Sequence, residues 1–191
     1  MSIKSQLIPI FIENDAIEFV ISTLEEHYKS ISVDNKDDTY NTGEQHIFVL
    51  DFSTALLSNI LHSKIAIEWL RNNSETCVDI SDRLLNSIYQ EKMPPSVMMH
   101  VLICLSYIIK SPTLKNYVET PECQFTERIS QFVEYFSKKP INSKLAAGEK
   151  DVPQVDDENG DIDKRTIMDL CAYMFHPPKD GEAQEEMNSA D

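Results

Sequence analysis

Glycine is scarce in this sequence, and its cysteines are widely spaced. Only 4 of the 191 residues are glycine, which disfavours sandwiches and barrels, because all-β folds are usually rich in tight turns. The four cysteines, at positions 77, 104, 123 and 171, form no CxxC pair, and we therefore expect reduced thiols. These features favour helices before any periodic pattern is considered.

Sequence motifs for catalysis and nucleotide binding are also missing. There is no GxGxxG, P-loop, HExxH or GxSxG motif, and so few glycines offer little backbone for a phosphate-binding loop. Neighbouring carboxylates such as Glu25 and Glu26 lie on the polar side of a predicted helix, where a solvated face explains them. We expect neither an enzyme nor a cofactor.

Long hydrophobic runs and an excess of positive charge are missing as well. The longest nearly apolar stretch, residues 97–109, is shorter than the roughly 20 residues that a membrane-spanning helix needs. The apolar patch near the N-terminus is too short for a signal peptide. The formal net charge of −15 repels nucleic acid. We expect a cytoplasmic protein that binds no nucleic acid and spans no membrane.

Apolar residues recur at helical spacing from Asp15 to Phe136. Residues 33–43 interrupt the pattern and are predicted to form a solvated loop. The stretch at 96–110 is apolar on nearly every side, so other helices should surround it. In the stretch at 44–61, one face carries Phe48, Phe52, Ala55, Leu56, Asn59 and Ile60. Helices are predicted at 15–28, 44–61, 63–71, 77–90 and 96–110, after Ser111, and from Pro121.

A shift of 48 residues superimposes one part of the sequence on another. Ala55-Leu56-Leu57 falls on Ile103-Cys104-Leu105, and the serines that open the two short helices, Ser63 and Ser111, coincide. The shift is close to the ~40 to 47 residues of armadillo and HEAT repeats. We therefore predict an all-α fold that is a short armadillo- or HEAT-like helical-repeat solenoid.

The sequence DFSTALLSNI at residues 51–60, followed by Ser63-Lys64 and later by residues 96–114, carries a family resemblance. It resembles the armadillo-repeat region of the LisH-bearing armadillo-repeat family of cilia and basal bodies. The similar stretch spans about residues 50–119, and its most specific part is the Ala-Leu-Leu-x-Asn core. The resemblance implies a non-enzymatic scaffold of the basal body or axoneme. Lacking a LisH segment and a long array, the chain is a divergent relative, a C-terminal remnant or a different armadillo-like protein.

The C-terminal residues differ in composition from the rest. Residues 149–191 carry 13 acidic and four basic side chains, and apolar residues thin out after Pro140. We predict a helical domain at 1–139 and a largely disordered acidic tail at 140–191. A short amphipathic helix at about 165–176 either caps its own solenoid or docks on another protein. Its candidate protein-binding residues are Ile167, Met168, Leu170, Cys171, Met174 and Phe175.

Two patterns are typical of metal sites, and both are incomplete. His100 and Cys104 are one helical turn apart, but no second pair lies near, so a packed imidazole beside a core thiol explains them better. Residues 155–166 partly match a calcium-binding EF-hand loop, with Gly160 at the sixth position. Val155 at the first position and Thr166 at the twelfth replace two of the strongest ligands. We expect no bound metal.

The helical pattern and the resemblance lead to two functional hypotheses. The first is a non-enzymatic protein-binding scaffold at the ciliary basal body, centriole or axoneme, with cytoskeletal or ciliary proteins as partners. The alternative is a small regulatory subunit that binds an enzyme or complex through its C-terminal tail helix. Both hypotheses predict that the ligands are other proteins.

Overall fold

The computed structural model describes residues 5–32, 42–90, 93–138 and 164–175, and every regular element in these ranges is helical. A 3₁₀ turn at Ser5–Leu7 leads into the first α-helix. The α-helices are α1 (Ile8–Glu13), α2 (Ala16–Ser32), α3 (Thr42–Leu61), α4 (Lys64–Asn72), α5 (Ser74–Ser87), α6 (Pro95–Lys110), α7 (Pro112–Val118), α8 (Phe125–Lys138) and α9 (Lys164–Phe175).

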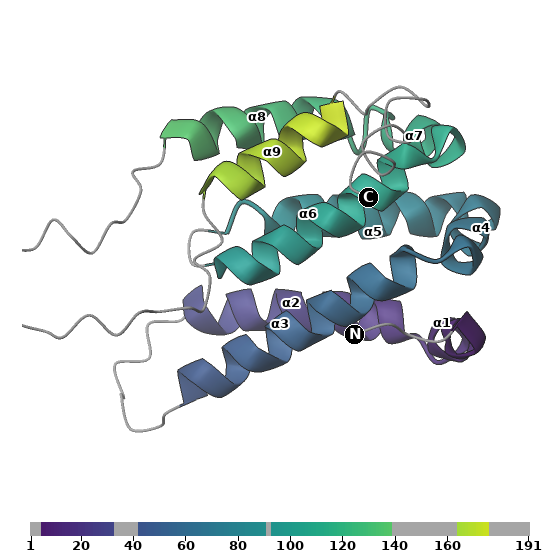
Figure 1. The fold of residues 1–191 in the computed structure, drawn as a ribbon, viewed down its shortest axis with the longest axis horizontal. Coiled ribbons are helices and arrows are strands. Elements are labelled where there is room, and N and C mark those ends of the chain that lie inside the picture. Colours follow the sequence, from purple (N-terminus) through teal and green to yellow (C-terminus); the bar gives the residue numbers. More distant parts are fainter. Residues whose placement is uncertain (1–4, 33–41, 91–92, 139–163, 176–191) are drawn as a thin grey trace, which may run out of the picture.

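The helices lie in layers (Figure 1). α2 packs with α3 at the bottom of the view, α5 with α6 in the middle, and α8 with α9 at the top. α3 and α6 run alongside each other and join the lower layer to the middle one. The short helices α1, α4 and α7 gather at one end of the layers, where α4 contacts both α1 and α7.

The predicted helices are present, and most of their boundaries lie within a few residues of the expected ones. Pro95 opens α6 and Pro112 opens α7. Proline is favoured there because the first N–H groups of a helix have no partner within it. α8 begins at Phe125 instead of Pro121, since Gln124 adopts a positive φ of 48° that no α-helix contains.

One helix was not predicted, the six-residue α1. It is too short to produce a helical period in the sequence, and Asp15, with a φ of 52°, separates it from α2. Ile8 of α1 is only 1% exposed, and the helix contacts α2 and α4. The apolar patch near the N-terminus therefore contributes to the core.

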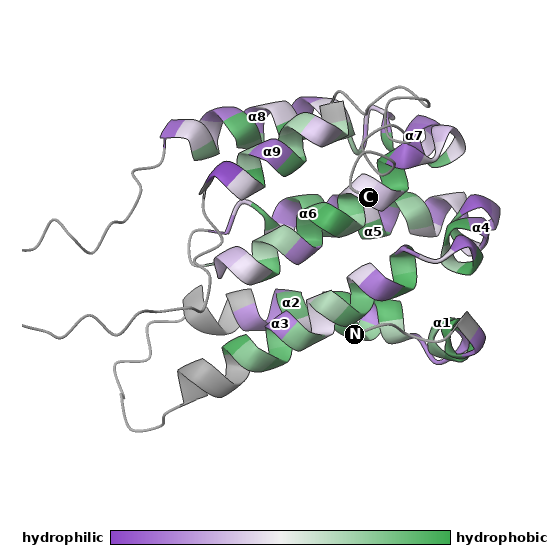
Figure 2. Cartoon of the chain, viewed as in Figure 1, coloured by the Kyte–Doolittle hydropathy of each residue, from purple (hydrophilic) through white to green (hydrophobic). Residues whose placement is uncertain are grey.

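α6 is the centre of the core. Its residues Leu102, Cys104, Leu105 and Ile108 are completely buried, and α3, α5, α7 and α9 all contact it. Figure 2 shows apolar residues along most of its length. The prediction that other helices surround this segment is confirmed. Among the described helices, none alone is long and apolar enough to cross a membrane; α6 and α7 would be so only together, across a bend of 110°.

Arginines join the layers to one another. Arg83 of α5 donates hydrogen bonds to two carboxylates of α2: its Nε lies 2.7 Å from Glu25 Oε1, and its Nη1 lies 2.7 Å from Glu18 Oε2. This guanidinium holds the pKa of Glu18 below its usual value of 4.5. Arg128 of α8 pairs in the same way with Asp82 of α5 at 2.5 Å. Such pairs orient neighbouring helices more than they stabilise the fold.

Ser63 and Ser111 precede the short helices α4 and α7, but they form different contacts. The Ser63 hydroxyl accepts a hydrogen bond from the backbone N–H of Ala66 at 3.1 Å and so caps α4. The Ser111 hydroxyl instead accepts from the guanidinium of Arg71 in α4, at 3.2 and 3.3 Å. Tyr117 of α7 donates to the carbonyl of Arg71 at 3.3 Å. These bonds hold the two short helices side by side.

α3 buries only the C-terminal part of the face that the sequence pattern indicated, where Ile60 is completely buried and Leu56 packs against the core. Phe48 and Phe52, from the expected face, are 72% and 57% exposed. α3 is apolar on two sides, and periodicity alone cannot tell which side packs against the rest of the chain. From Ile47 onward, the buried residues of α3 are Leu50, Ser53, Thr54, Leu57, Ile60 and Leu61.

Some of the sequence predictions concern residues outside the described ranges. These are most of the loop predicted at 33–43, the tail at 140–163 and 176–191, and the EF-hand-like segment up to residue 163. The part of the predicted tail that is described is α9, which begins one residue earlier than expected. α9 lies against α6 and α8, so this part of the tail belongs to the helical layers.

Candidate protein-binding surfaces

α9 carries the residues that the sequence pattern indicated for protein binding. Three of them are at most 4% exposed, because α9 packs against α6 and α8: Ile167, Cys171 and Met174. Met168 and Leu170 are half-buried, and the side chain of Phe175 lies outside the described part of the chain. The centre of the predicted binding site is therefore in the core of its own chain.

Further contacts hold α9 in this position. The Nζ atom of Lys110 in α6 lies 4.8 Å from the ring centre of Tyr173 and 5.5 Å from that of Tyr107, within the range of cation–π contacts. Burial raises the pKa of the Cys171 thiol to about 12. A partner can reach the buried side chains only if α9 leaves α6 and α8. That α9 docks on another protein stays a prediction.

The N-terminal half of α3 carries an apolar surface that is already accessible. Phe48 and Phe52 lie one helical turn apart, and the opposite side of the helix packs against α2 and α6. Apolar side chains that are exposed as a group are typical of protein-binding surfaces, whereas single ones are common everywhere. The exposed apolar residues of this surface, here called the α3 patch, are Ile47, Phe48, Val49 and Phe52, between 43% and 72% exposed.

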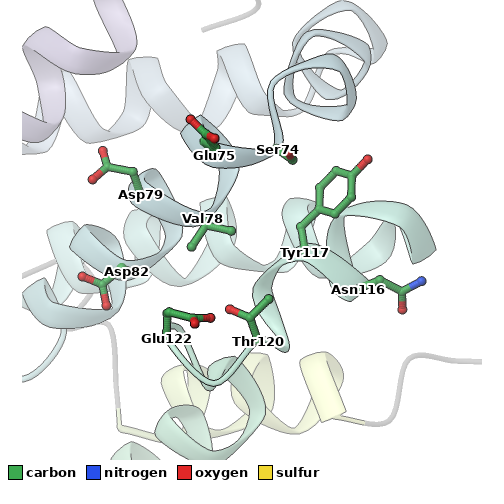
Figure 3. A pocket seen from close by; sticks show the side chains of 9 residues that line it. All are labelled: Ser74, Glu75, Val78, Asp79, Asp82, Asn116, Tyr117, Thr120 and Glu122. Atoms are coloured by element: carbon green, nitrogen blue, oxygen red, sulfur yellow. The ribbon is translucent and has the colours of Figure 1, made fainter.

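A concave acidic surface lies between α5 and the end of α7 (Figure 3). Its volume is about 630 Å³, which is within the range of ligand-binding clefts. It holds four carboxylates and no lysine or arginine side chain. The residues that line it, here called the acidic groove, are Ser74, Glu75, Val78, Asp79, Asp82, Asn116, Tyr117, Thr120 and Glu122.

The carboxylates of the acidic groove come from two elements. Glu75, Asp79 and Asp82 follow one another along α5, and Glu122 lies across the groove from them, in the turn between α7 and α8 (Figure 3). Asp82 pairs with the arginine of α8 at 2.5 Å, and Asp79 lies 3.4 Å from Arg83. Glu75 and Glu122 have no ion-pair partner among the described side chains. Within the described ranges, two of the four negative charges thus have no paired cation.

The floor and one end of the acidic groove are less polar. Val78 lies in the middle and Tyr117 at the end nearest Ser74 (Figure 3). The hydrogen bond from the Tyr117 hydroxyl to the carbonyl of Arg71 fixes the Tyr117 ring. Thr120 Oγ1 is buried and has no hydrogen-bond partner among the described residues. Solvent does not reach this oxygen, so it is not a contact point for a ligand in the groove.

Sequence reasoning missed the acidic groove. The spacing of Glu75, Asp79 and Asp82 is i, i+4 and i+7, which could have indicated one acidic side of a helix. Their proximity to Tyr117 and Glu122, about 40 residues further along the chain, depends on how α7 packs against α5. No local signal in the sequence contains that information.

The cysteine and histidine of α6 do not form a reactive pair. Burial raises the pKa of the Cys104 thiol far above its usual value, and burial also raises the pKa of Cys77 and of Cys123 to about 11. A thiol is a nucleophile only as the thiolate, so these groups are poorly reactive. His100 Nε2 lies 3.8 Å from Asp51 Oδ1, too far for a hydrogen bond.

Neither a cluster of metal-binding residues nor similarity to a known protein identifies another functional site. Among the described side chains, no group of three or more His, Cys, Asp or Glu residues is arranged to hold a metal ion. No protein-family model, curated protein or solved structure matches the chain. The α3 patch and the acidic groove are thus the candidate binding surfaces of the described residues.

Replacing His100 by glutamine is expected to flatten the pH dependence of stability. Burial lowers the pKa of His100 below its usual value of 6.5, although Asp51 opposes the shift. As the pH drops from about 7 to about 5, the unfolded chain therefore takes up a proton at His100 more readily than the folded chain does. The free energy of unfolding falls over this range. Urea denaturation at several pH values measures this slope. Equal slopes in His100→Gln and the natural chain would contradict the prediction.

Proposed function

We propose that the chain is a non-enzymatic protein-binding scaffold with the fold of a short armadillo- or HEAT-like solenoid. Two consecutive sets of helices support the repeat, α3 to α5 and α6 to α8, each with a long, a short and a long helix. Leu57 and Leu105, which the shift of 48 residues superimposes, are both completely buried, as are Leu70 and Val118. Stacked repeats bury a continuous core and leave an extended surface for partners.

The α3 patch is the observation on which this proposal depends. A helix that is apolar on all sides is stable when neighbours cover all of its sides. α6 meets this condition, whereas the described part of the chain covers only one side of α3. A second protein that covers Phe48 and Phe52 would remove apolar surface from water, and such burial is the main driving force of association.

The cellular part of the proposal comes from the resemblance of residues 50–119 to the armadillo-repeat family of cilia and basal bodies. Scaffolds of that family belong to the basal body and axoneme. We therefore propose cytoskeletal or ciliary partners, and a cytoplasmic location at the basal body or centriole. The raised pKa values of the described thiols argue against a cysteine nucleophile.

Replacing both Phe48 and Phe52 by serine is expected to abolish enrichment at basal bodies with little effect on stability. Both side chains are mostly exposed, and Phe and Ser have similar helix propensities, so the free energy of unfolding should change by no more than about 0.5 kcal/mol. Imaging of tagged copies in ciliated cells, combined with proximity labelling, measures enrichment. Thermal unfolding measures stability.

Phe19→Ser is the matched control for this experiment, because Phe19 is 66% exposed on α2 and lies outside the α3 patch. It should leave both enrichment and stability unchanged. A double serine variant that stays at basal bodies as strongly as this control would exclude the α3 patch as the binding surface. A diffuse signal for the natural chain would remove the ciliary role.

The alternative, a regulatory subunit that binds through its tail helix, requires a rearrangement that the α3 patch does not. α9 would have to uncover parts of α6 and α8 before Ile167 or Cys171 could contact a partner. Deleting residues 150–191 would also remove these contacts, so loss of binding after the deletion has two causes. Point substitutions on α3 separate the hypotheses better, because they leave α9 in place.

A further inference from the structure

We infer that the acidic groove binds an extended, lysine- or arginine-rich segment of a partner protein. This inference rests on the proposed function, because it names the chemistry of one partner of the scaffold. The groove is separate from the α3 patch: it lies between α5 and α7, whereas the patch belongs to α3. Its volume of about 630 Å³ is sufficient for a ligand to enter, and its lining determines which ligand that is.

The spacing of the carboxylates fits an extended chain. Glu75 and Asp79 are four residues apart on α5, which corresponds to about 6 Å along the helix axis. Side chains on one side of an extended peptide recur about every 6.6 Å, because two residues separate them. A segment with a basic residue at every second position can therefore place one cation beside Glu75 and the next beside Asp79.

The charge balance of the groove favours cations. No lysine or arginine side chain lines it, and Glu75 and Glu122, on its two sides, have no ion-pair partner among the described residues. Asp79 is only loosely paired, at 3.4 Å from Arg83, whose shorter bonds go to α2. A cleft lined by one sign of charge concentrates the field and raises the local concentration of oppositely charged ligands.

The remaining lining residues fit a peptide better than a single ion. Val78 and the ring of Tyr117 offer apolar surface to the long alkyl chains of lysine and arginine, and the ring can also stack on a guanidinium. The side-chain amide of Asn116 is exposed and can hydrogen-bond to a peptide backbone. A metal ion does not explain the groove, because no three described carboxylates converge on one point.

The test uses the full-length chain and a short synthetic peptide in which lysine or arginine alternates with serine. Replacing both Glu75 and Glu122 by glutamine is expected to weaken binding of this peptide about five- to tenfold, since two partly exposed charge contacts are lost. Added salt should also weaken binding of the peptide to the natural chain. Calorimetric titration measures the affinity, and hydrogen exchange should show protection at residues 74–82 and 116–122.

Glu13→Gln with Glu26→Gln is the matched control, because it removes the same charge from two exposed carboxylates outside the groove. It should bind the peptide like the natural chain. Equal weakening in both double variants would mean that only the overall charge attracts the peptide, and no binding to the natural chain would also overturn the inference. Neither result affects the α3 patch, whose test depends on other residues and on enrichment in cells.

Discussion

Replacing Leu105 by alanine is expected to lower the free energy of unfolding by about 3 to 4 kcal/mol. Leu105 is completely buried on α6, the helix that four others contact. The substitution removes apolar atoms from the core and leaves a cavity that helices packed on several sides cannot close. Urea denaturation measures the change as a lower midpoint with an unchanged slope.

Leu105→Met is the control for this substitution, because it keeps the side-chain volume and should cost less than about 1.5 kcal/mol. Leu57→Ala provides a second comparison, since Leu57 is equally buried and lies 48 residues earlier. Similar losses at the two positions would agree with a repeated packing unit. A loss below about 1 kcal/mol at Leu105 would mean that the core can collapse around it, contrary to the packing of α6.

The surroundings of α6 could be predicted from the sequence because its composition leaves no alternative. Val97, Leu102 and Ile103 point to different sides of one helix, so solvent on any side would be unfavourable. The start of α6 was equally clear, because Pro94 and Pro95 can end one helix and open the next. In both cases the deciding information lies within a few residues of the chain.

α3 could be predicted as a helix, but its packing could not. One apolar set includes Phe48 and Phe52, and another includes Leu50 and Leu57, and each has helical spacing. The choice between them depends on the shape of α2 and α6, which a local pattern does not contain. The larger aromatic side chains, Phe48 and Phe52, are the exposed ones.

The position of α9 shows the same limit. The amphipathic pattern predicted a helix at 165–176, and the structure has one at Lys164–Phe175. Whether its apolar side faces its own chain or a partner depends on the empty surface between α6 and α8, and that surface exists only after both helices have packed. The pattern therefore indicated a helix that needs a neighbour, without identifying the neighbour.

Replacing Ile167 by aspartate is expected to detach α9 and to lower the free energy of unfolding by about 2 to 4 kcal/mol. Ile167 is 1% exposed between α9 and its neighbours. An unpaired carboxylate is so unfavourable in apolar surroundings that α9 should leave instead of burying it. The decrease in the free energy of unfolding cannot exceed the free energy that holds α9 in place. It should therefore be smaller than the decrease caused by an equally severe substitution in α6.

Cys171 reports directly on this detachment. Burial raises the pKa of its thiol to about 12, against an ordinary value of 9.0, so release of α9 should increase its alkylation rate by on the order of a hundredfold or more. The thiol of Cys77 is buried on α5 and should stay slow, whereas Cys104 lies on α6, which α9 contacts. Mass spectrometry of the alkylated peptides distinguishes the four sites.

Ala172→Asp is the matched control for Ile167→Asp, because it introduces the same group at an exposed position of α9. It should leave both the alkylation of Cys171 and the free energy of unfolding nearly unchanged. Slow alkylation in both variants would mean that α9 tolerates a buried charge and is held more firmly than three buried side chains explain. Fast alkylation already in the natural chain would mean that α9 opens readily, and a partner could then reach Ile167 and Cys171 without any substitution.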